Sequence, residues 1–338
     1  MFNELKTKIM EKKDIFDDIL GQNHVKQQLK SALLTGRHVI ISGPPGIGKT
    51  TLAKNVAKLL GEATVNDCGY NCPPDNPQCP VCRSGKNIKT KKITGLQRFV
   101  RIQGSPDLTA EDLLGDIDPI KALKFGPLSI EAFTPGKIFR ANNGVLFFDE
   151  VNRCPEKLQN ALLQVLEERK ATIGSFDVDI DADFILIATM NPKDVSTENL
   201  SDVFLDRFDS IQMSYPENVE IEQEIVKMRA KDLDIKFPDD LFEMSVLFIR
   251  LLRENENLEK VPSVRASIGL YERACANALL DKRKKVNFDD IQKAVLSVLV
   301  HRIRLKPSAK YLQKKEAFVK EQFDKFASEH ELKEGDFP

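Results

Sequence analysis

Residues 43–50 read GPPGIGKT and fit the pattern G-x-x-x-x-G-K-[ST] at every position. They follow the short apolar run 38–42, typical of a buried strand, and precede 50–60, where apolar residues recur at helical spacing. Glycines at such a turn let backbone N–H groups curl around phosphate oxygens, and the helix directs its positive end at them. The sequence therefore predicts a phosphate-binding loop, made of Gly43, Pro44, Pro45, Gly46, Ile47, Gly48, Lys49, Thr50 and Thr51.

A second acidic site completes the chemistry that such a loop needs. Residues 145–150 read VLFFDE, an apolar strand with an acidic end. Lys49 would reach the β- and γ-phosphates of a nucleotide, and the Thr50 hydroxyl would ligate Mg²⁺. Asp149 would hold the same ion through water, and Glu150 would orient and deprotonate the attacking water. The expected cofactors are ATP and Mg²⁺, and the expected reaction converts ATP and water to ADP and phosphate.

The order of apolar runs predicts the architecture. Strands are expected at 99–102, 145–149, 184–189 and 210–213 besides 38–42, and a helix at 155–169. Strands that alternate with helices indicate a parallel α/β sheet. The pattern becomes helical after Pro216, so we expect a core of residues 1–215 and a helical domain of residues 216–338. Within the core, 61–95 is interpreted as an insertion with little regular structure, and the charged tail from Lys306 as a solvated helix.

The overall composition limits the classes of partner that we expect for this protein. The 338 residues are 41% hydrophobic and 30% charged, with a formal net charge of -1, which is ordinary for a globular protein and gives no general attraction to nucleic acid. No run of 18 apolar residues indicates a membrane helix, and the charged N-terminus lacks the apolar region of a secretory signal. A cytoplasmic location with no membrane partner is the expectation.

Four of the six cysteines fall close together. Cys68, Cys72, Cys79 and Cys82 form the spacing C-x3-C-x6-C-x2-C. Four thiolates suit a tetrahedral structural Zn²⁺, which is the favoured interpretation in a reducing compartment. The alternatives are an iron–sulfur cluster, unliganded surface thiols and two disulfides, the last disfavoured in the cytosol. The other two cysteines, Cys154 and Cys275, stand alone in helical segments and are expected to be buried packing residues.

The motifs taken in order resemble those of the AAA+ ATPases: GPPGIGKT, LFFDE, ATMNP, FLDRF and PSVRA. Residues 112–123 (DLLGDIDPIKAL) and 133–146 are similar to the helix-2-insert branch, and within it to the magnesium-chelatase ATPase subunit. Residues 70–77 also resemble a chelatase segment, whereas 156–163 are nearer to the MoxR-like ATPases. The resemblance implies a three-layer P-loop AAA+ domain with a smaller all-α lid.

The same resemblance implies roles for residues outside the two motifs. Arg207 would be the arginine finger that enters a neighbouring subunit's ATP site, in a homo-oligomeric ring, expected to be a hexamer. Arg265 would be the second sensor, on the lid. Asn191 would be the first sensor, where an amide positions the attacking water. Residues against the adenine would be Leu20, Gly21 and Gln22.

Three functions share this ATPase core. The first is a chelatase-type motor that couples ATP turnover to a chelatase partner subunit. The second is a MoxR-like chaperone ATPase that remodels a protein, with a von Willebrand A-domain partner. The third, a nucleic-acid motor, is disfavoured because the hairpin expected at 173–181 carries Asp177, Asp179 and Asp181 rather than basic residues. The lysine-rich stretch 86–92 is interpreted as a solvated loop.

Overall fold

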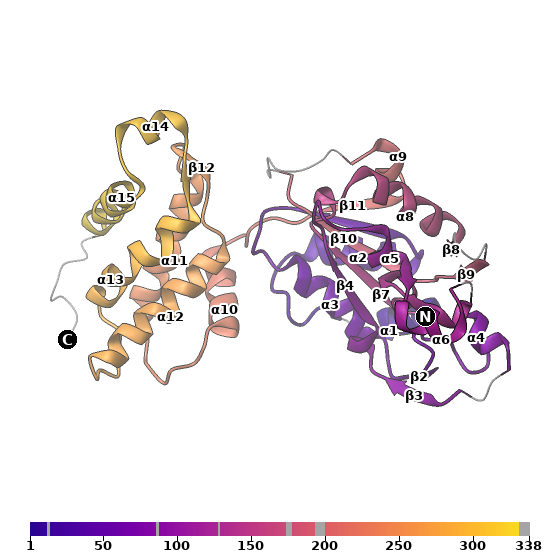
Figure 1. The fold of residues 1–338 in the computed structure, drawn as a ribbon. Coiled ribbons are helices and arrows are strands. Elements are labelled where there is room, and N and C mark those ends of the chain that lie inside the picture. Colours follow the sequence, from indigo (N-terminus) through magenta and orange to yellow (C-terminus); the bar gives the residue numbers. More distant parts are fainter. Residues whose placement is uncertain (12–13, 86–87, 128, 174–177, 193–199, 331–338) are drawn as a thin grey trace. The chain divides into compact units, whose positions relative to one another are not determined.

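The structure is a computed structural model that describes residues 1–11, 14–85, 88–127, 129–173, 178–192 and 200–330. The chain divides into two compact units (Figure 1). The first comprises Met1–Pro44 and Gly48–Met213, and the second comprises Pro45–Ile47 and Ser214–Pro338.

Five parallel strands form the centre of the first unit, in the order β11-β1-β10-β7-β4. The interior strands are almost entirely buried, as near-continuous apolar runs in a parallel sheet require. The α/β parallel sheet predicted from the sequence is thereby confirmed. The strands are β1 (His38–Ser42), β4 (Phe99–Gln103), β7 (Val145–Asp149), β10 (Ile185–Met190) and β11 (Phe208–Gln212).

Helices surround this sheet. The helix α2 packs against β1 and β11, and α3 packs against β7 and β10. The helices of this unit are α1 (Phe2–Glu11), α2 (Asn23–Leu34), α3 (Lys49–Leu59), α4 (Pro80–Arg83), α5 (Ala110–Leu114), α6 (Pro119–Phe125), α7 (Lys137–Arg140), α8 (Glu156–Glu168) and α9 (Asp202–Leu205). Among the described residues, no helix is long and apolar enough to cross a membrane.

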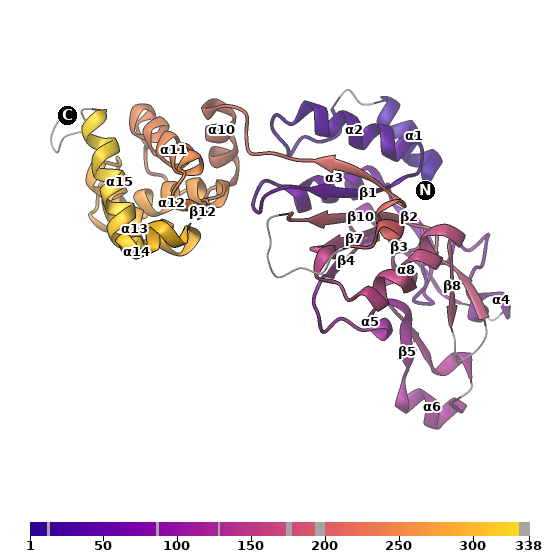
Figure 2. The same ribbon diagram turned by 90° about the horizontal axis from the view of Figure 1, so that it is seen from above.

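Short antiparallel pairs extend the first unit. Strands β5 (Gly115–Ile117) and β6 (Phe133–Pro135) carry α6 away from the sheet, as Figure 2 shows. Strands β8 (Lys170–Ile173) and β9 (Val178–Asp181) form the expected hairpin, and its predicted turn, with Asp177, lies outside the described residues.

The interpretation of residues 61–95 as largely irregular was wrong. This segment contains an antiparallel pair, β2 (Ala63–Asn66) with β3 (Thr90–Ile93), as well as α4. The lysines of β3 led to the interpretation of this stretch as a solvated loop. They are indeed exposed, but they lie on a strand whose last residue, Ile93, is buried. An edge pair of this kind needs few apolar residues, since its core contact is confined to one face.

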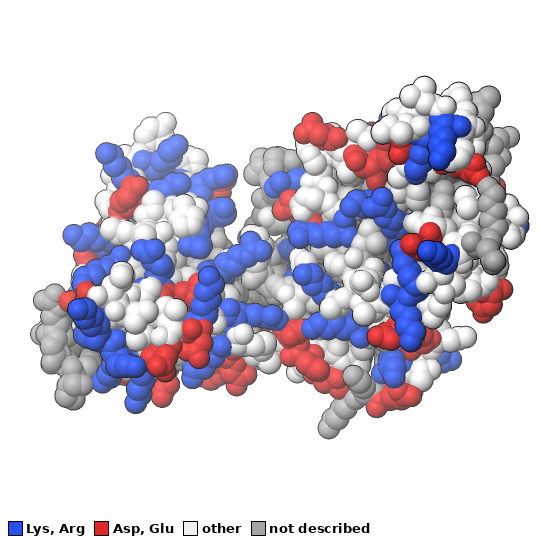
Figure 3. Space-filling model, turned by 60° about the horizontal axis from the view of Figure 1, so that its bottom comes forward, with Lys and Arg blue, Asp and Glu red and all other residues white. Residues whose placement is uncertain are grey.

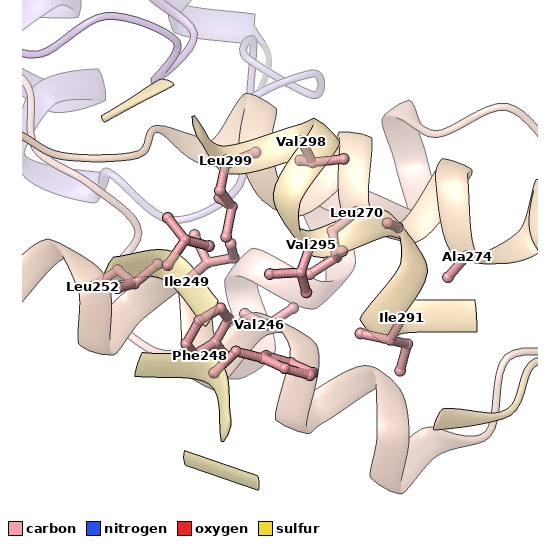
Figure 4. Packing of buried hydrophobic residues seen from close by; sticks show 14 of the residues in the cluster. Val246, Phe248, Ile249, Leu252, Leu270, Ala274, Ile291, Val295, Val298 and Leu299 are labelled. Carbon is pink, nitrogen blue, oxygen red and sulfur yellow. The ribbon is translucent and has the colours of Figure 1, made fainter. Parts of the chain in front are cut away.

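The second unit is a helical domain around its own core, part of which is drawn in Figure 4. That core joins residues of α11, α12 and α13, including Ile249, Leu270 and Val295. The elements are α10 (Val219–Arg229), α11 (Asp239–Glu254), β12 (Leu258–Lys260), α12 (Val264–Leu280), α13 (Phe288–Leu299), β13 (Arg304–Leu305), α14 (Pro307–Leu312) and α15 (Lys315–Glu329).

The C-terminal segment is helical as expected, but the expectation that this helix is solvated was wrong. The apolar side chains of α15 recur at helical spacing beneath its charges and are buried in the domain core: Phe318, Val319, Phe323, Phe326 and Ala327. Phe248 of α11 packs on Phe323, with ring centroids 5.1 Å apart. The helix α15 is therefore an integral part of this domain.

His38, the first residue of β1, makes the stability of the first unit sensitive to acid. Its Nδ1 accepts the N–H of Leu186 at 3.0 Å. Burial, with a smaller effect from the charge of Arg169, lowers the pKa of His38 from 6.5 to about 4. As the pH falls below 6.5, the unfolded chain therefore binds a proton that the folded chain rejects, and stability is lost between these two values.

We expect the free energy of unfolding to fall by about 2 kcal/mol between pH 7 and pH 5 because of this one group. Replacing His38 with Gln removes the titration, so a His38→Gln protein should lose correspondingly less stability over the same interval. Urea unfolding of both proteins at the two pH values measures the difference. Equal losses in the two proteins would refute the assignment to His38.

Candidate functional site

The loop after β1 has the backbone that a phosphate-binding turn requires. Gly46 and Gly48 have φ angles of 75° and 101°, in the left-handed region that favours glycine. The Lys49 Nζ donates to the carbonyls of Gly43 and Pro44, at 2.5 and 2.8 Å. The amino group is thus held over the loop, beside the backbone that would curl around phosphate oxygens.

The segment expected at the adenine lies beside this loop. A side chain added at Gly48 would meet the Cδ1 atom of Ile19 at 3.2 Å, so the segment between α1 and α2 lies against the loop. Gly21 and Gln22 follow with φ angles of 62° and 56°, and Gln22 caps α2. Residues 20–22 therefore form a sharp turn close to the start of α3.

The acidic pair ends β7 in a network of hydrogen bonds. The Thr189 hydroxyl donates to Asp149 Oδ1 at 2.7 Å, and the Glu150 N–H donates to the Thr189 Oγ1 at 3.0 Å. Glu150 itself has a φ of 55°, an uncommon conformation for a residue other than glycine. Thr189 therefore holds the carboxylate of Asp149 and the backbone of Glu150.

Two residues of β4 also reach this pair. Arg101 Nη2 donates to Asp149 Oδ2 at 2.6 Å, and Gln103 Nε2 donates to Glu150 Oε2 at 3.1 Å. Thr189, Arg101 and Gln103 were missed by the sequence reasoning, which considered each motif separately. The signal that would have found them is strand register, because Gln103 stands opposite Asp149 in the parallel β4–β7 pair.

Asn191 follows β10 at the same edge of the sheet. The Gly43 N–H donates to the Met190 carbonyl at 3.2 Å, so the end of β10 touches the start of the phosphate loop. Asn152 Nδ2, just after the acidic pair, donates to the Asn191 carbonyl at 3.4 Å. The fold thus brings the loop, Asp149–Glu150 and Asn191 together at the carboxyl ends of three adjacent strands.

Arg207 lies at the opposite end of the strands, just before β11 begins. In the parallel β1–β11 pair, Phe208 is opposite His38 and Gln212 is opposite Ser42. Arg207 precedes β11, whereas Gly43 follows β1. The two residues are therefore separated along the strand direction by about five residues at ~3.3 Å each. Its guanidinium pairs with Glu167 at 3.0 Å and Asp206 at 3.3 Å.

Arg265 belongs to the other unit. It is the second residue of α12, and its side chain is exposed. Among the residues that the structure describes, no carboxylate forms an ion pair with it. Burial, followed by the positive charge of Arg265, lowers the pKa of Arg302. The guanidinium of Arg265 is therefore available to an anion.

The four clustered cysteines converge in space. Their Sγ atoms all lie within 4.8 Å of one another, three of the residues are buried, and Cys68 is half-buried. Tetrahedral Zn²⁺ with Zn–S bonds of about 2.3 Å places its sulfurs about 3.8 Å apart. The donor set, its spacing and its burial fit such an ion.

Several hydrogen bonds reach the sulfurs of the cluster. The Cys79 N–H donates to Cys72 Sγ at 3.3 Å, the Cys82 N–H donates to Cys79 Sγ at 3.4 Å, and Asn66 Nδ2 donates to Cys82 Sγ at 3.4 Å. Hydrogen bonds from Cys72 and Cys79 lower the pKa of Cys68, whereas its bond to Cys68 raises the pKa of Cys72 to about 11. These hydrogen bonds thus favour the thiolate of Cys68 over that of Cys72.

The cysteine cluster is attached to the rest of the unit by side chains between its ligands. Tyr70 packs on Phe139 of α7 with ring centroids 5.4 Å apart. Asn142 Nδ2 donates to Gln78 Oε1 at 2.5 Å, and Arg83 pairs with Asp181 of β9 at 3.3 Å. The remaining cysteines, Cys154 and Cys275, are buried in the two cores as expected.

Comparison with known proteins agrees with this geometry. Residues 84–210 match the model of the ATPase family associated with various cellular activities (AAA), residues 258–322 match the AAA lid domain, and residues 15–69 match magnesium chelatase, subunit ChlI. The magnesium-chelatase subunit ChlI homolog of Methanocaldococcus jannaschii is 29% identical over 86% of this chain and 86% of its own length.

The comparison with solved structures gives two examples. A chain from the complex between subunits BchI and BchD of magnesium chelatase is 24% identical, with 88% of this chain and 98% of that chain covered and a TM-score of 0.49. A mutant of the RuvB Holliday junction branch migration motor of Thermotoga maritima is 22% identical, with 83% and 72% covered and a TM-score of 0.51. This likeness concerns the fold alone. From the motifs, the fold and the family matches together, the chain is an AAA ATPase related to the ChlI subunit of magnesium chelatase, with an AAA lid domain.

Proposed function

We propose that this chain hydrolyses ATP as a homo-oligomeric ring, a hexamer, and couples turnover to remodelling of a chelatase-type partner subunit. One observation supports it above the others. The phosphate loop, Asp149–Glu150 and Asn191 gather at one edge of the sheet, while Arg207 lies at the other. A site divided in this way is complete only when a second copy supplies the arginine.

Each residue near the phosphate loop would have its own role in ATP hydrolysis. When bound, MgATP supplies the γ-phosphoryl group that water attacks. Lys49 would bind the phosphates, and Thr50 and Asp149 would hold the Mg²⁺. Glu150, directed by Thr189 and Gln103, would accept the proton of the attacking water, and Asn191 would orient that water. Arg265 would contact the same nucleotide from the lid.

A protein partner is favoured over nucleic acid. The formal net charge is -1, and on the face drawn in Figure 3 basic and acidic side chains are interspersed. The projecting helix α6 exposes Ile120 and Leu123, 80% and 92% accessible, which suits contact with another protein rather than with phosphates. The relation to ChlI suggests that this partner is a chelatase-type subunit.

We further propose that Cys68, Cys72, Cys79 and Cys82 hold a structural Zn²⁺. The mutual Sγ distances and the N–H···S bonds support four thiolates around one ion. The ion would cross-link the loop that joins β2 to β3, and would contribute no step to hydrolysis. Through Tyr70 and Gln78, this loop supports the segment that leads into β7.

The first test concerns Glu150. A Glu150→Gln protein should bind ATP with Mg²⁺ but release phosphate about 10²- to 10⁴-fold more slowly, because the attacking water has lost its base. Lys49→Ala should lose binding itself. Glu168→Gln, at an exposed glutamate of α8, is the control and should behave as wild type. Phosphate release and binding of a fluorescent ATP analogue provide the readouts, and normal turnover by Glu150→Gln would overturn the role of Glu150.

The second test concerns Arg207. Losing an arginine finger costs on the order of 10³- to 10⁵-fold in rate, so Arg207→Ala should be nearly inactive. Mixing it with Glu150→Gln should restore part of the activity, since some interfaces then join an intact Glu150 to an intact Arg207. Arg273→Ala, at an exposed arginine of the lid, should keep its turnover. No recovery in the mixture, or an active Arg207→Ala protein, would refute action between subunits.

The third test concerns the metal. Purified protein should contain about one zinc per chain by elemental analysis, and Cys79→Ser should lose it. Cys275→Ala, which removes a buried thiol outside the cluster, should retain the zinc. ATP binding should survive in Cys79→Ser, because the cluster lies in an insertion. A wild-type protein purified without chelators that contains no zinc would contradict the proposal.

A further inference from the structure

A buried carboxylate lies at the junction of three helices of the lid. The side chain of Glu222, in α10, is completely buried. It accepts two hydrogen bonds from Arg253 of α11, at 2.7 and 2.6 Å, a longer one from Arg250 of the same helix, at 3.4 Å, and one from the Ser267 hydroxyl of α12, at 2.5 Å. Such a pair adds little net stability once desolvation is counted, but its two-pronged geometry fixes direction closely.

Arg253 makes two further contacts with the backbone and side chains of distant segments. Its Nε donates to the Pro262 carbonyl at 2.9 Å, just before α12 and Arg265. Its guanidinium also lies over the ring of Tyr215, 4.6 Å from the centroid. Tyr215 is in the linker that leads from β11 into the lid, so one side chain joins this linker to the segment that carries Arg265.

Arg250, one turn earlier on α11, holds the rest of the linker. It donates to three successive carbonyls, those of Pro216 at 2.9 Å, Glu217 at 3.0 Å and Asn218 at 3.2 Å. Residues three apart lie on the same face of a helix, so Arg250 and Arg253 act from one surface of α11. The linker from Tyr215 to Asn218 is therefore fastened to α11 along its length.

We propose that Arg253 and Glu222 are positioning residues for Arg265, which hold the linker and the start of α12 as one rigid body. Arg265 is exposed and its own side chain has no ion pair among the described residues, so its location depends on the backbone of residues 262–265. Arg253 holds this backbone at the Pro262 carbonyl, and Glu222 holds the first turn of α12 through the Ser267 hydroxyl. A change in the linker is thereby transmitted to Arg265. The consequence for catalysis rests on the nucleotide contact proposed above for Arg265.

The lid contains a matched control pair. Asp290 of α13 is also completely buried and accepts two hydrogen bonds from Arg283, at 2.7 and 2.6 Å. The pair also bonds to Asp281, Lys285 and Asn287, which belong to the turn between α12 and α13. In chemistry and in the burial of its carboxylate it resembles Arg253–Glu222, although Arg283 is more exposed than Arg253. These contacts involve neither the linker nor residues 262–267.

The experiment compares Arg253→Lys with Arg283→Lys in the full chain, since lysine keeps the charge and loses the two-pronged bond. Arg253→Lys should raise amide hydrogen exchange at least tenfold in both 214–219 and 262–267. It should also reduce kcat/KM for ATP by about ten- to a hundredfold. Combined with Arg265→Ala, it should add no further loss. Arg283→Lys should lower thermal stability while leaving exchange at both segments and the ATP kinetics at wild-type values.

Faster exchange in only one of the two segments, or equal effects of the two lysine variants, would overturn the proposal. A loss that multiplies with that of Arg265→Ala would likewise refute action through Arg265. If Arg265→Ala alone turns over ATP normally, the nucleotide contact fails, and the exchange data still decide whether the rigid body exists. Should Arg253→Lys not fold, Ser267→Ala and Arg250→Lys test the two halves, since lysine keeps the positive charge beside Glu222. Each should raise exchange in its own segment, and unchanged exchange in either would count against the rigid body.

Discussion

The strand β1 pairs in parallel with β10 on one side and β11 on the other, and the remaining geometry depends on this arrangement. Because all three strands run the same way, whatever follows β1 and β10 lies at one edge, and whatever precedes β11 lies at the other. The phosphate loop and Asn191 share the first edge, and Arg207 stands at the second. No displacement of a side chain can exchange these positions, since only a reversal of β11 would do so.

The same pairing explains which parts of the site could be predicted from the sequence. The loop 43–50 and Asp149–Glu150 each carry their chemistry in consecutive residues, and each sits at the end of an apolar run that marks a strand. Thr189, Arg101 and Gln103 reach the acidic pair only through strand register, which a single apolar run does not specify. Their residue types are ordinary for strand ends, so nothing local distinguishes them.

The two errors in the fold have a common cause. In β3 and in α15, charged residues outnumber the apolar ones that determine packing, and composition concealed the spacing. In α15 the aromatic residues lie on one face and complete the lid core against Phe248. In the insertion, Val65 and Ile93 are buried, and Asn66, next to Val65, donates a hydrogen bond to a sulfur of the cluster. A bound metal would there substitute for the apolar core that so short a segment lacks.

Different interactions position the functional residues in the core and in the lid. In the core, main-chain hydrogen bonds between strands set the positions of the functional residues, and these positions are rigid by construction. In the lid, apolar packing holds the helices together but specifies the direction of the linker only loosely. Arg250 and Arg253 fix the direction of the linker by hydrogen bonding to backbone carbonyl oxygens. Apolar packing offers no such directional bond. The buried Glu222, between three helices, in turn fixes the direction of Arg253.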